Sequence, residues 1–343
     1  MQHSLRLAGA LVLTGTLVLS GCGSDGGSDG GSDGSNGSGG GGGGDKIAAV
    51  IKGLDNPFFQ AMEDGINAQA EEDSVSVTVQ AAQSITDTTG QSDKLSALAQ
   101  QDYGCFVVNP ISGTNLVNGL ARIGAKDIPI VNIDSPVDAK AAKAAGVDLT
   151  TYIGTDNTEA GGKAGDAMVE AVGSGKVALI GGISGDVTSG ARLDGFTKAV
   201  EGKLDIVQTT AADWERQKAL TAATTIMDKN PDLKGFFAAN DDMGLGIVQA
   251  VKNAGKTGKV TVISVDGNKD ALQAVQAGDL YATVAQYPYA VGQLGVQACE
   301  KAMAGDEVPD NIVSPTALVT KDKAAEAIAK FPAPFEAFEN PLD

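Results

Sequence analysis

Side chains suited to binding a polyhydroxylated molecule follow the ends of successive predicted strands. Carboxylates accept hydrogen bonds from hydroxyls, amides both donate and accept, and a guanidinium donates in a fork. Aromatic rings pack against the apolar C–H faces of a sugar ring. The candidate binding residues of these kinds are Asn56, Phe58, Phe59, Asn109, Asp134, Thr155, Arg192, Trp214, Asn240, Asp266 and Gln286. Two acidic groups and one arginine suit a neutral sugar better than an anionic ligand.

Each of these residues also has a purely structural interpretation. Asp, Asn and Ser at strand ends commonly form turns or cap helices. Phe58 and Phe59 could be core residues at the start of a helix, and Trp214 could pack against its own helix. Arg192 could pair with Asp194 at the surface. The binding hypothesis therefore depends on the candidates meeting at one edge of the fold.

Short apolar strands and helices with one apolar face alternate along the chain after residue 45. The predicted strands cover 46–51, 75–80, 105–108, 128–133, 152–154, 176–180, 205–209, 235–238, 260–265, 280–285 and 312–319. The predicted helices cover 57–72, 91–101, a segment through Leu116 and Leu120, 158–172, 191–200, 215–228, 243–254, 269–277 and 289–304. Such alternation predicts parallel sheets covered by helices on both faces.

The strands and helices fall into two series, which defines the predicted fold class. We expect an α/β protein with two similar doubly wound parallel-sheet lobes and a ligand cleft between them. In such sheets ligands bind beyond the carboxyl ends of the strands. The candidate residues lie at these ends, so the predicted fold would bring them together.

The distribution of histidine argues against an enzyme. The only histidine, His3, lies in the predicted export signal, so the rest of the chain offers no Ser-His-Asp triad, Cys-His pair or histidine metal ligand. The glycine-rich stretches lack the residues of a dinucleotide-binding or phosphate-binding loop. Only catalysis by carboxylates alone stays open. We therefore predict a binding protein without catalytic residues, cofactor or metal.

Two cysteines, Cys105 and Cys299, remain beyond Cys22. They allow one disulfide at most. Both lie in apolar surroundings, which favours buried free thiols. The sequence does not decide whether they pair.

The first 44 residues are expected to export and tether the protein. Residues 1–21 are predicted to be a signal peptide, because Arg6 precedes an apolar run shorter than the ~20 residues of a membrane span. Small residues before Cys22 predict cleavage and lipid attachment there; the alternative is an ordinary secretory signal with an unrelated cysteine. Residues 22–44 form a Gly/Ser/Asp-rich linker. We expect an extracytoplasmic protein held at the cell membrane by lipid alone, at the cell surface or periplasmic face.

The net charge of the chain limits its partners. It is −18 at pH 7, which favours solubility and opposes binding to nucleic acid. The expected partners are a small-molecule sugar and a membrane transporter.

Eight segments, taken together, resemble the periplasmic sugar-binding proteins of the ribose-binding type. They are DNPFF at 55–59, VVNP at 107–110, IPIVNID at 128–134, GTDN at 154–157, RLDGF at 192–196, FAAND at 237–241, VDG at 265–267 and AQ at 285–286. The resemblance covers about residues 45 to 320 in the family's order. It implies a type I periplasmic-binding-protein fold with three hinge crossovers, a closing cleft and delivery of sugar to an ABC importer permease by a monomer. It also implies sugar contacts for the candidate residues given above.

One departure from the family affects the expected ligand. Ser135 follows Asp134 where ribose binders place an arginine, which removes a strong donor and leaves space. Ribose is therefore no better supported than another pentose, a hexose or a polyol. Ser135 joins the candidate ligand-binding residues. Trp214 stands where ribose binders often have another aromatic residue, a smaller change.

The chain is expected to pass between the two lobes more than once. The N-terminal lobe is predicted to comprise 45–154 and 287–311, and the C-terminal lobe 155–286 and 312–320. Residues 321–343 form a C-terminal tail that exceeds the usual end of the family.

Three other kinds of protein are alternatives to a transport protein. A sugar-sensing transcriptional repressor is disfavoured because an export signal stands in place of a DNA-binding helix-turn-helix. An enzyme is disfavoured by the missing histidine and cofactor loops. A receptor that binds a sugar or an amino acid for a membrane signalling system stays open, since Asp could bind an amine and Arg192 a carboxylate.

Overall fold

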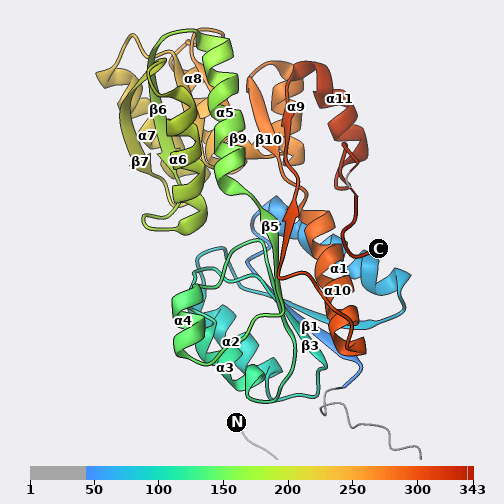
Figure 1. Ribbon diagram of the computed structural model, residues 1–343. Helices are drawn as coiled ribbons and strands as arrows, with labels where there is room; N and C mark the ends of the chain where they lie inside the picture. Colours follow the sequence, from blue (N-terminus) through green and yellow to red (C-terminus); the bar gives the residue numbers. More distant parts are fainter. Residues whose placement is uncertain (1–43, 338) are drawn as a thin grey trace, which may run out of the picture. The chain divides into compact units, whose positions relative to one another are not determined.

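The computed structural model describes residues 44–337 and 339–343, which form two six-stranded sheets flanked by helices (Figure 1). The first sheet contains β1 Lys46–Ile51, β2 Ser76–Ala81, β3 Cys105–Val108, β4 Ile130–Ile133, β5 Thr151–Thr155 and β11 Asn311–Ser314. The second contains β6 Gly175–Gly181, β7 Leu204–Ala211, β8 Gly235–Ala238, β9 Thr261–Asp266, β10 Ala282–Ala285 and β12 Ala317–Val319. The helices are α1 Pro57–Glu72, α2 Thr88–Leu98, α3 Val117–Gly124, α4 Ala139–Ala144, α5 Asn157–Val172, α6 Val187–Val200, α7 Arg216–Lys229, α8 Asp241–Asn253, α9 Lys269–Ala277, α10 Pro288–Ala304 and α11 Lys321–Lys330. The predicted fold class is confirmed.

The first sheet is parallel throughout, with the strand order β11-β5-β4-β3-β1-β2. Alternate side chains of β1 point to opposite faces of the sheet. Ile47 and Ile51 belong to the core that includes residues of α1 and α10, whereas Ala48 and Val50 belong to the core that includes residues of α2 and α3. Burial of both faces explains why β1 is apolar without interruption from Ile47 to Ile51.

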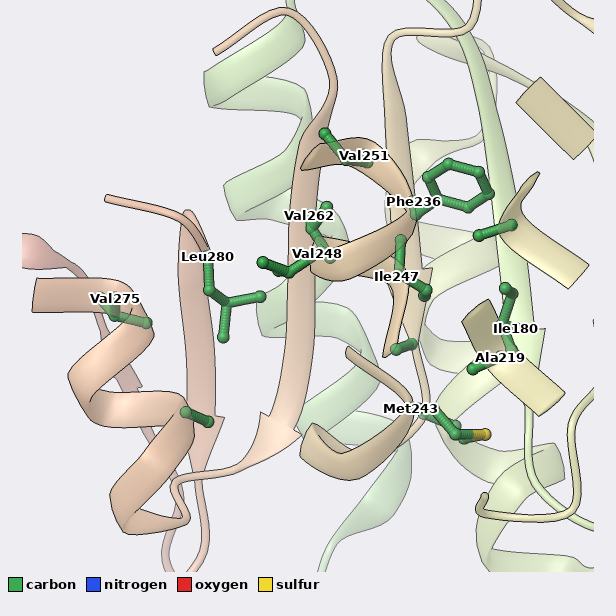
Figure 2. Close-up of a cluster of buried hydrophobic side chains, with 14 of the residues drawn as sticks. Ile180, Ala219, Phe236, Met243, Ile247, Val248, Val251, Val262, Val275 and Leu280 are labelled. Atoms are coloured by element: carbon green, nitrogen blue, oxygen red, sulfur yellow. The ribbon is translucent and has the colours of Figure 1, made fainter. Parts of the chain in front are cut away.

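The second sheet has the order β12-β10-β9-β8-β6-β7, and β12 is antiparallel to β10. On one face, Phe236 of β8 packs in a core with Ile247 of α8 and Val262 of β9 (Figure 2). On the other face, Phe237 stacks on Phe196 of α6 with ring centroids 4.5 Å apart. The antiparallel edge strand is a departure from the expected all-parallel sheet.

The chain passes from one sheet to the other three times: between β5 and β6, between β10 and β11, and between β11 and β12. The single strand predicted at 312–319 is wrong, because β11 ends at Ser314 and β12 begins at Ala317 in the other sheet. Pro315 interrupts it, since proline has no N–H to donate to a ladder. The third change of sheet therefore falls at 315–316, after the predicted boundary at 311/312. Lys163 Nζ donates to both oxygens of Thr316, at 2.7 and 2.9 Å.

Two helices, α4 and α11, were not predicted from the sequence. α4 begins after Asp138, whose carboxylate accepts from the backbone N–H of Ala141 at 2.7 Å. α11 lies in the predicted tail and packs against α9. Beyond α11, the Phe335 ring meets the Tyr287 ring edge-on at 6.3 Å, and Leu342 is buried in the core of the first sheet. The tail thus contacts elements of both sheets, and the C-terminus lies near α10 (Figure 1).

Cys105 and Cys299 form a disulfide, which corrects the expectation of free thiols. Cys105 opens β3 and Cys299 lies on α10, 194 positions later in the chain. Packing of α10 on the sheet places their Cα atoms 5.6 Å apart, within the ~4.4–6.8 Å that a disulfide requires. This proximity arises from tertiary packing and has no local sequence signal.

The predicted signal peptide at 1–21, the lipid attachment at Cys22 and nearly all of the linker at 22–44 lie outside the described residues. Within 44–337 and 339–343, no helix has the length and apolar character that a membrane span requires.

Candidate ligand-binding site

A cavity is lined by residues that follow strands of both sheets. The lining residues are Lys52, Asn56, Phe58, Phe59, Ile85, Ile111, Asp134, Ser135, Ile183, Thr188, Arg192, Trp214, Asn240 and Asp266. The site therefore draws on both lobes at the carboxyl ends of their strands, as expected for such sheets.

Nine of the twelve predicted ligand-binding residues line this cavity. They are Asn56, Phe58, Phe59, Asp134, Ser135, Arg192, Trp214, Asn240 and Asp266. The other three, Asn109, Thr155 and Gln286, do not line it. The fold thus brings most of the predicted set together, although the residues are spread over 211 positions of the chain from Asn56 to Asp266, both included.

The three residues outside the cavity are buried. Gln286 Nε2 donates to Asp266 Oδ1 at 2.8 Å. The Thr155 backbone oxygen accepts from Asn157, a residue that also bonds Arg192. Asn109 Nδ2 lies 3.5 Å from the Met62 sulfur, and Asn109 Oδ1 has no hydrogen-bond partner in the described part of the chain. Gln286 and Thr155 therefore support the residues that line the cavity.

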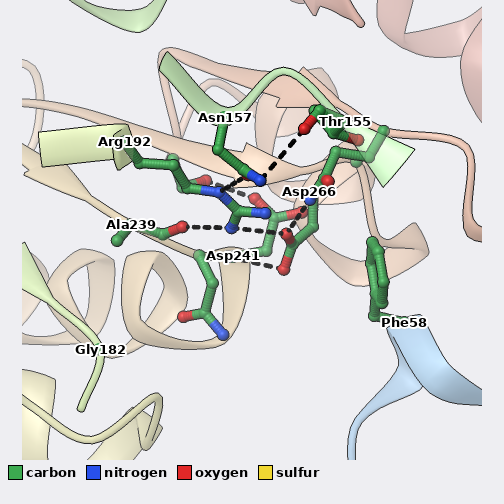
Figure 3. Close-up of polar contacts among 12 residues, drawn as sticks. Phe58, Thr155, Asn157, Gly182, Arg192, Ala239, Asp241 and Asp266 are labelled. Atoms are coloured by element: carbon green, nitrogen blue, oxygen red, sulfur yellow. Dashed lines mark hydrogen bonds and ion pairs between the residues drawn. The ribbon is translucent and has the colours of Figure 1, made fainter. Parts of the chain in front are cut away.

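Arg192 and Asp266 form a buried ion pair in the wall of the cavity contributed by the second sheet (Figure 3). Their atoms Nη1 and Oδ1 are 3.2 Å apart, and the residues are only 4% and 5% exposed. Arg192 Nη1 also donates to the Ala239 carbonyl at 2.6 Å, and Nε donates to Asn157 Oδ1 at 2.8 Å. The guanidinium is thereby fixed in place, and the surface pairing with Asp194 is wrong.

The electrostatics of Asp266 follow from this burial. Desolvation raises the pKa of its carboxyl to about 6, against the opposing effect of the Arg192 guanidinium. Asp134 adds to the rise in pKa through charge repulsion, and the Gln286 amide opposes it. At neutral pH the carboxylate is therefore an acceptor for ligand hydroxyls, and it gains a proton in mildly acidic solution.

Aromatic rings form apolar walls on both sides of the cavity. Phe58 and Phe59 meet edge-on with centroids 5.2 Å apart, and both also belong to the core of the first sheet. The Arg192 guanidinium carbon lies 5.9 Å from the centroid of the Trp214 ring. A β-carbon on Gly182 would overlap the Trp214 ring, so this glycine permits the close approach of the ring. This role of Gly182 was not predicted from the sequence.

Asn56 and Asn240 combine helix capping with lining of the cavity. Asn56 Oδ1 accepts from the Phe58 N–H at 2.9 Å and begins α1, and Asn240 Oδ1 accepts from the Met243 N–H at 2.9 Å and begins α8. Both amides keep an Nδ2 group without a hydrogen bond in the part of the chain that the structure describes. The capping interpretation is thus correct for these two residues and leaves a donor for a ligand.

Asp134 adopts a left-handed backbone conformation, with φ of 58°. The Tyr152 hydroxyl donates to its backbone oxygen at 2.6 Å, and burial raises the pKa of Tyr152, which keeps the hydroxyl protonated. Ser135 Oγ donates to Asp134 Oδ2 at 3.1 Å. These contacts aim the Asp134 carboxylate at the cavity.

Lys52 is a lining residue that sequence analysis missed. Its Nζ donates to Ser135 Oγ at 2.6 Å, and it lies 3.9 Å from Asp134 Oδ2 and 5.3 Å from the Phe59 ring centroid. The ammonium thus supplies a donor beside Ser135, where the loss of an arginine suggested only free space. Lys52 directly follows β1, so the strand-end criterion used for the other candidates would have found it.

The fold and the site define a two-lobed α/β binding protein with a small-molecule cavity between the lobes. The chain belongs to the family described as periplasmic binding protein domain, which matches residues 47–307.

Individual relatives agree with this assignment. The chain is 36% identical to the D-allose-binding periplasmic protein of Escherichia coli K12, over 80% of this chain and 91% of that protein. It is 32% identical to the ribose import binding protein RbsB of Bacillus subtilis, over 80% of this chain and 87% of that protein. The crystal structure of an ABC transporter periplasmic solute-binding protein from Actinobacillus succinogenes with bound D-allose superposes with a TM-score of 0.77 at 31% identity, over 82% of this chain and 99% of that one.

Proposed function

We propose that the protein is the extracytoplasmic binding component of an ABC sugar importer, and that it captures one monosaccharide in the cavity between its lobes. It delivers the sugar, as a monomer, to a membrane permease and carries out no chemical reaction. The proposal rests on the lining of the cavity, in which fixed hydrogen-bonding groups from both lobes lie between aromatic rings.

The charges in the cavity favour a neutral ligand. Arg192 is paired with Asp266, and Lys52 lies next to Asp134, so neither cation is free to neutralise a bound anion. The two carboxylates accept hydroxyl hydrogen bonds, whereas the Asn56 and Asn240 amides donate them. A sugar, whose hydroxyls donate and accept at once, satisfies both kinds of group.

The surroundings of Ser135 favour an aldohexose over a pentose. Ser135 is short, and Lys52 presents an ammonium donor beside it. A hydroxymethyl group is the additional part of a hexopyranose, and its oxygen is a suitable acceptor for this donor. The similarity to proteins named for D-allose makes this sugar the first to test.

Ligand capture is proposed to proceed by closure of the lobes around the sugar. A ligand that contacts both lobes binds the closed form better than the open form and shifts the balance by that difference in affinity. The three connections between the sheets would act as the hinge. The closed form then presents both lobes to the permease.

Attachment to the membrane is proposed to occur through lipid on Cys22. A metabolically incorporated fatty-acid label would be retained by the full chain and lost in Cys22→Ala. Equal labelling of the two chains would exclude this attachment.

Titration calorimetry against D-allose, D-ribose, D-glucose and D-galactose tests the binding function. Arg192→Ala and Asp266→Ala are each expected to weaken binding of the preferred sugar by more than tenfold while the protein stays folded by circular dichroism. Arg216→Ala is the matched control, because this exposed arginine pairs with Asp242 and Asp270 outside the cavity. Unchanged affinity in both site variants would refute the site.

A turnover assay separates transport binding from catalysis. The purified protein incubated with its preferred sugar should return that sugar unchanged by mass spectrometry. Mass spectrometry of the molecule that copurifies with the protein identifies the ligand independently of the panel, and an amino acid there would favour the receptor hypothesis.

A further inference from the structure

Asp241 carries a fully buried carboxylate that does not line the ligand cavity. It accepts three hydrogen bonds: from Ser264 Oγ at 2.5 Å, from Thr283 Oγ1 at 2.7 Å and from the Asn268 backbone N–H at 2.7 Å. No cation pairs with it among the described residues. Burial of a carboxyl group without a counter-ion costs free energy, which its hydrogen bonds partly offset. Such a group therefore suggests that the arrangement it holds together is needed.

The three donors surround the segment that carries Asp266. Ser264 lies two positions before Asp266 on β9, and Asn268 lies two positions after it. Thr283 is the register partner of Ser264 on β10, and its Oγ1 also accepts from the Gly267 N–H at 3.2 Å. One side chain thus joins both sides of the turn that follows β9 and the neighbouring strand.

The turn needs such support because its backbone is strained. Asp266 has φ of 139°, which residues with a β-carbon rarely adopt, and Gly267 follows with φ of 76°. This conformation puts the Asp266 carboxylate within reach of Arg192 and Gln286. The Asp241 backbone N–H also points to Asp266 Oδ2, at 3.5 Å.

The neighbouring residue Asp242 differs from Asp241 in its exposure and in its hydrogen-bond partners. Asp242 is partly exposed at the start of the same helix and accepts from the Arg216 backbone and guanidinium. It makes no hydrogen bond or ion pair with the turn after β9 in the structure described for 44–337 and 339–343. The two adjacent carboxylates therefore form a matched pair for mutagenesis.

We propose that Asp241 is a positioning residue, which holds the turn after β9 so that Asp266 presents its carboxylate to Arg192 and to the ligand. This inference deepens the proposed sugar-binding function and rests on it. Burial, and to a smaller extent the Asp266 carboxylate, raises the pKa of Asp241. An Asp241→Asn variant keeps the size of the side chain but replaces one acceptor oxygen by an N–H donor, so the amide cannot accept all three hydrogen bonds.

The test compares Asp241→Asn with Asp242→Asn by titration calorimetry with the preferred sugar. We expect Asp241→Asn to lose more than tenfold in affinity and Asp242→Asn to stay within twofold of the native protein. Combining Asp241→Asn with Asp266→Asn should add less than twofold to the loss caused by Asp266→Asn alone, because both changes act on one carboxylate. If the affinity losses of the two single variants multiply in the double variant, Asp241 acts independently of Asp266. That result would show a general structural role and overturn the proposal.

A crystal structure of Asp241→Asn without ligand tests the position of Asp266 directly, independently of any sugar affinity. Movement of the Asp266 carboxylate away from Arg192 Nη1 supports it, and an unchanged turn overturns it. If the native protein binds no sugar, the proposed function fails, whereas this structural comparison still tests whether Asp241 positions Asp266.

Discussion

Arg192 and Asp266 contact each other at 3.2 Å in the wall of the cavity, although 73 residues separate them in the chain. Arg192 comes from α6 and Asp266 from the end of β9; Arg192 donates to Asn157, and Asp266 accepts from Gln286. The pair is buried, so its charges are weakly screened by solvent. The ligand therefore meets a donor and an acceptor whose directions are already set.

The affinity for sugar should depend on the ionisation of Asp266. Its pKa in the unliganded protein is about 6, and Arg192, Asp134, Asp241 and Gln286 are the charged and polar groups facing it. Sugar hydroxyls donate to the ionised carboxylate, so binding favours the deprotonated form and affinity is lost as pH falls through this pKa. We expect roughly tenfold weaker binding at pH 5 than at pH 7.5, by the linkage of one proton.

Titration calorimetry at both pH values checks this dependence. Asp266→Asn, which cannot ionise, should bind with similar affinity at both. An equally steep pH dependence in that variant would assign it to another group.

Lys52→Met should reduce affinity for a hexose more than for a pentose. Methionine keeps the length of the apolar stem and removes the ammonium that lies 2.6 Å from Ser135. A hydrogen bond to a charged group contributes about 1.5–3 kcal/mol, so D-allose binding should weaken by at least about tenfold. D-ribose in its pyranose form, which lacks the hydroxymethyl group, should be less affected.

Lys46→Met is the control for that comparison, because Lys46 is exposed at the opposite end of β1. Equal losses for D-allose and D-ribose would show that Lys52 does not contact the hydroxymethyl group.

Gly182→Ala should displace the Trp214 ring from the cavity wall. The added methyl would overlap the ring, and it cannot be accommodated without movement of one or the other. We expect a shift in tryptophan fluorescence, which reports on Trp214 alone because the chain has one tryptophan, and weaker sugar binding. Gly190→Ala is the control, since its β-carbon would meet no atom within 4 Å. Native emission together with native affinity in Gly182→Ala would contradict this role.

Removal of the disulfide should lower stability without changing the site. Cys105→Ser combined with Cys299→Ser is expected to lower the free energy of unfolding by about 2–4 kcal/mol. Neither cysteine lines the cavity, so sugar affinity should stay within twofold. Urea unfolding of the native protein with and without a reducing agent provides the comparison. Identical unfolding curves would mean that the bond contributes nothing to stability.

Leu342→Ala should destabilise the protein through the C-terminal tail. Leu342 is buried in the core of the first sheet, and truncating a buried leucine costs about 2–5 kcal/mol. Asp343→Ala, at the exposed neighbouring position, should leave thermal unfolding unchanged. A native melting temperature for Leu342→Ala would show that burial of the Leu342 side chain does not contribute to the stability of the protein.

Much of the fold could be predicted because its signals are local. The alternation of short apolar strands with helices reflects burial of both faces of β1 and its neighbours, and it placed nearly every element. α4 was missed because it is only six residues long. β11 and β12 were predicted as one strand because only Pro315 and Thr316 lie between them in the sequence.

The sequence by itself determined which residues end the strands, and the rule that ligands bind at those ends selected eleven residues, eight of which line one cavity. Only the tertiary structure decided their partners: that Arg192 meets Asp266, that Lys52 meets Ser135, that Asp241 supports the turn after β9, and that Cys105 meets Cys299. The physical reason is that strand ends follow from local periodicity, whereas these contacts join segments brought together by packing of helices on sheets, a long-range property without a local pattern.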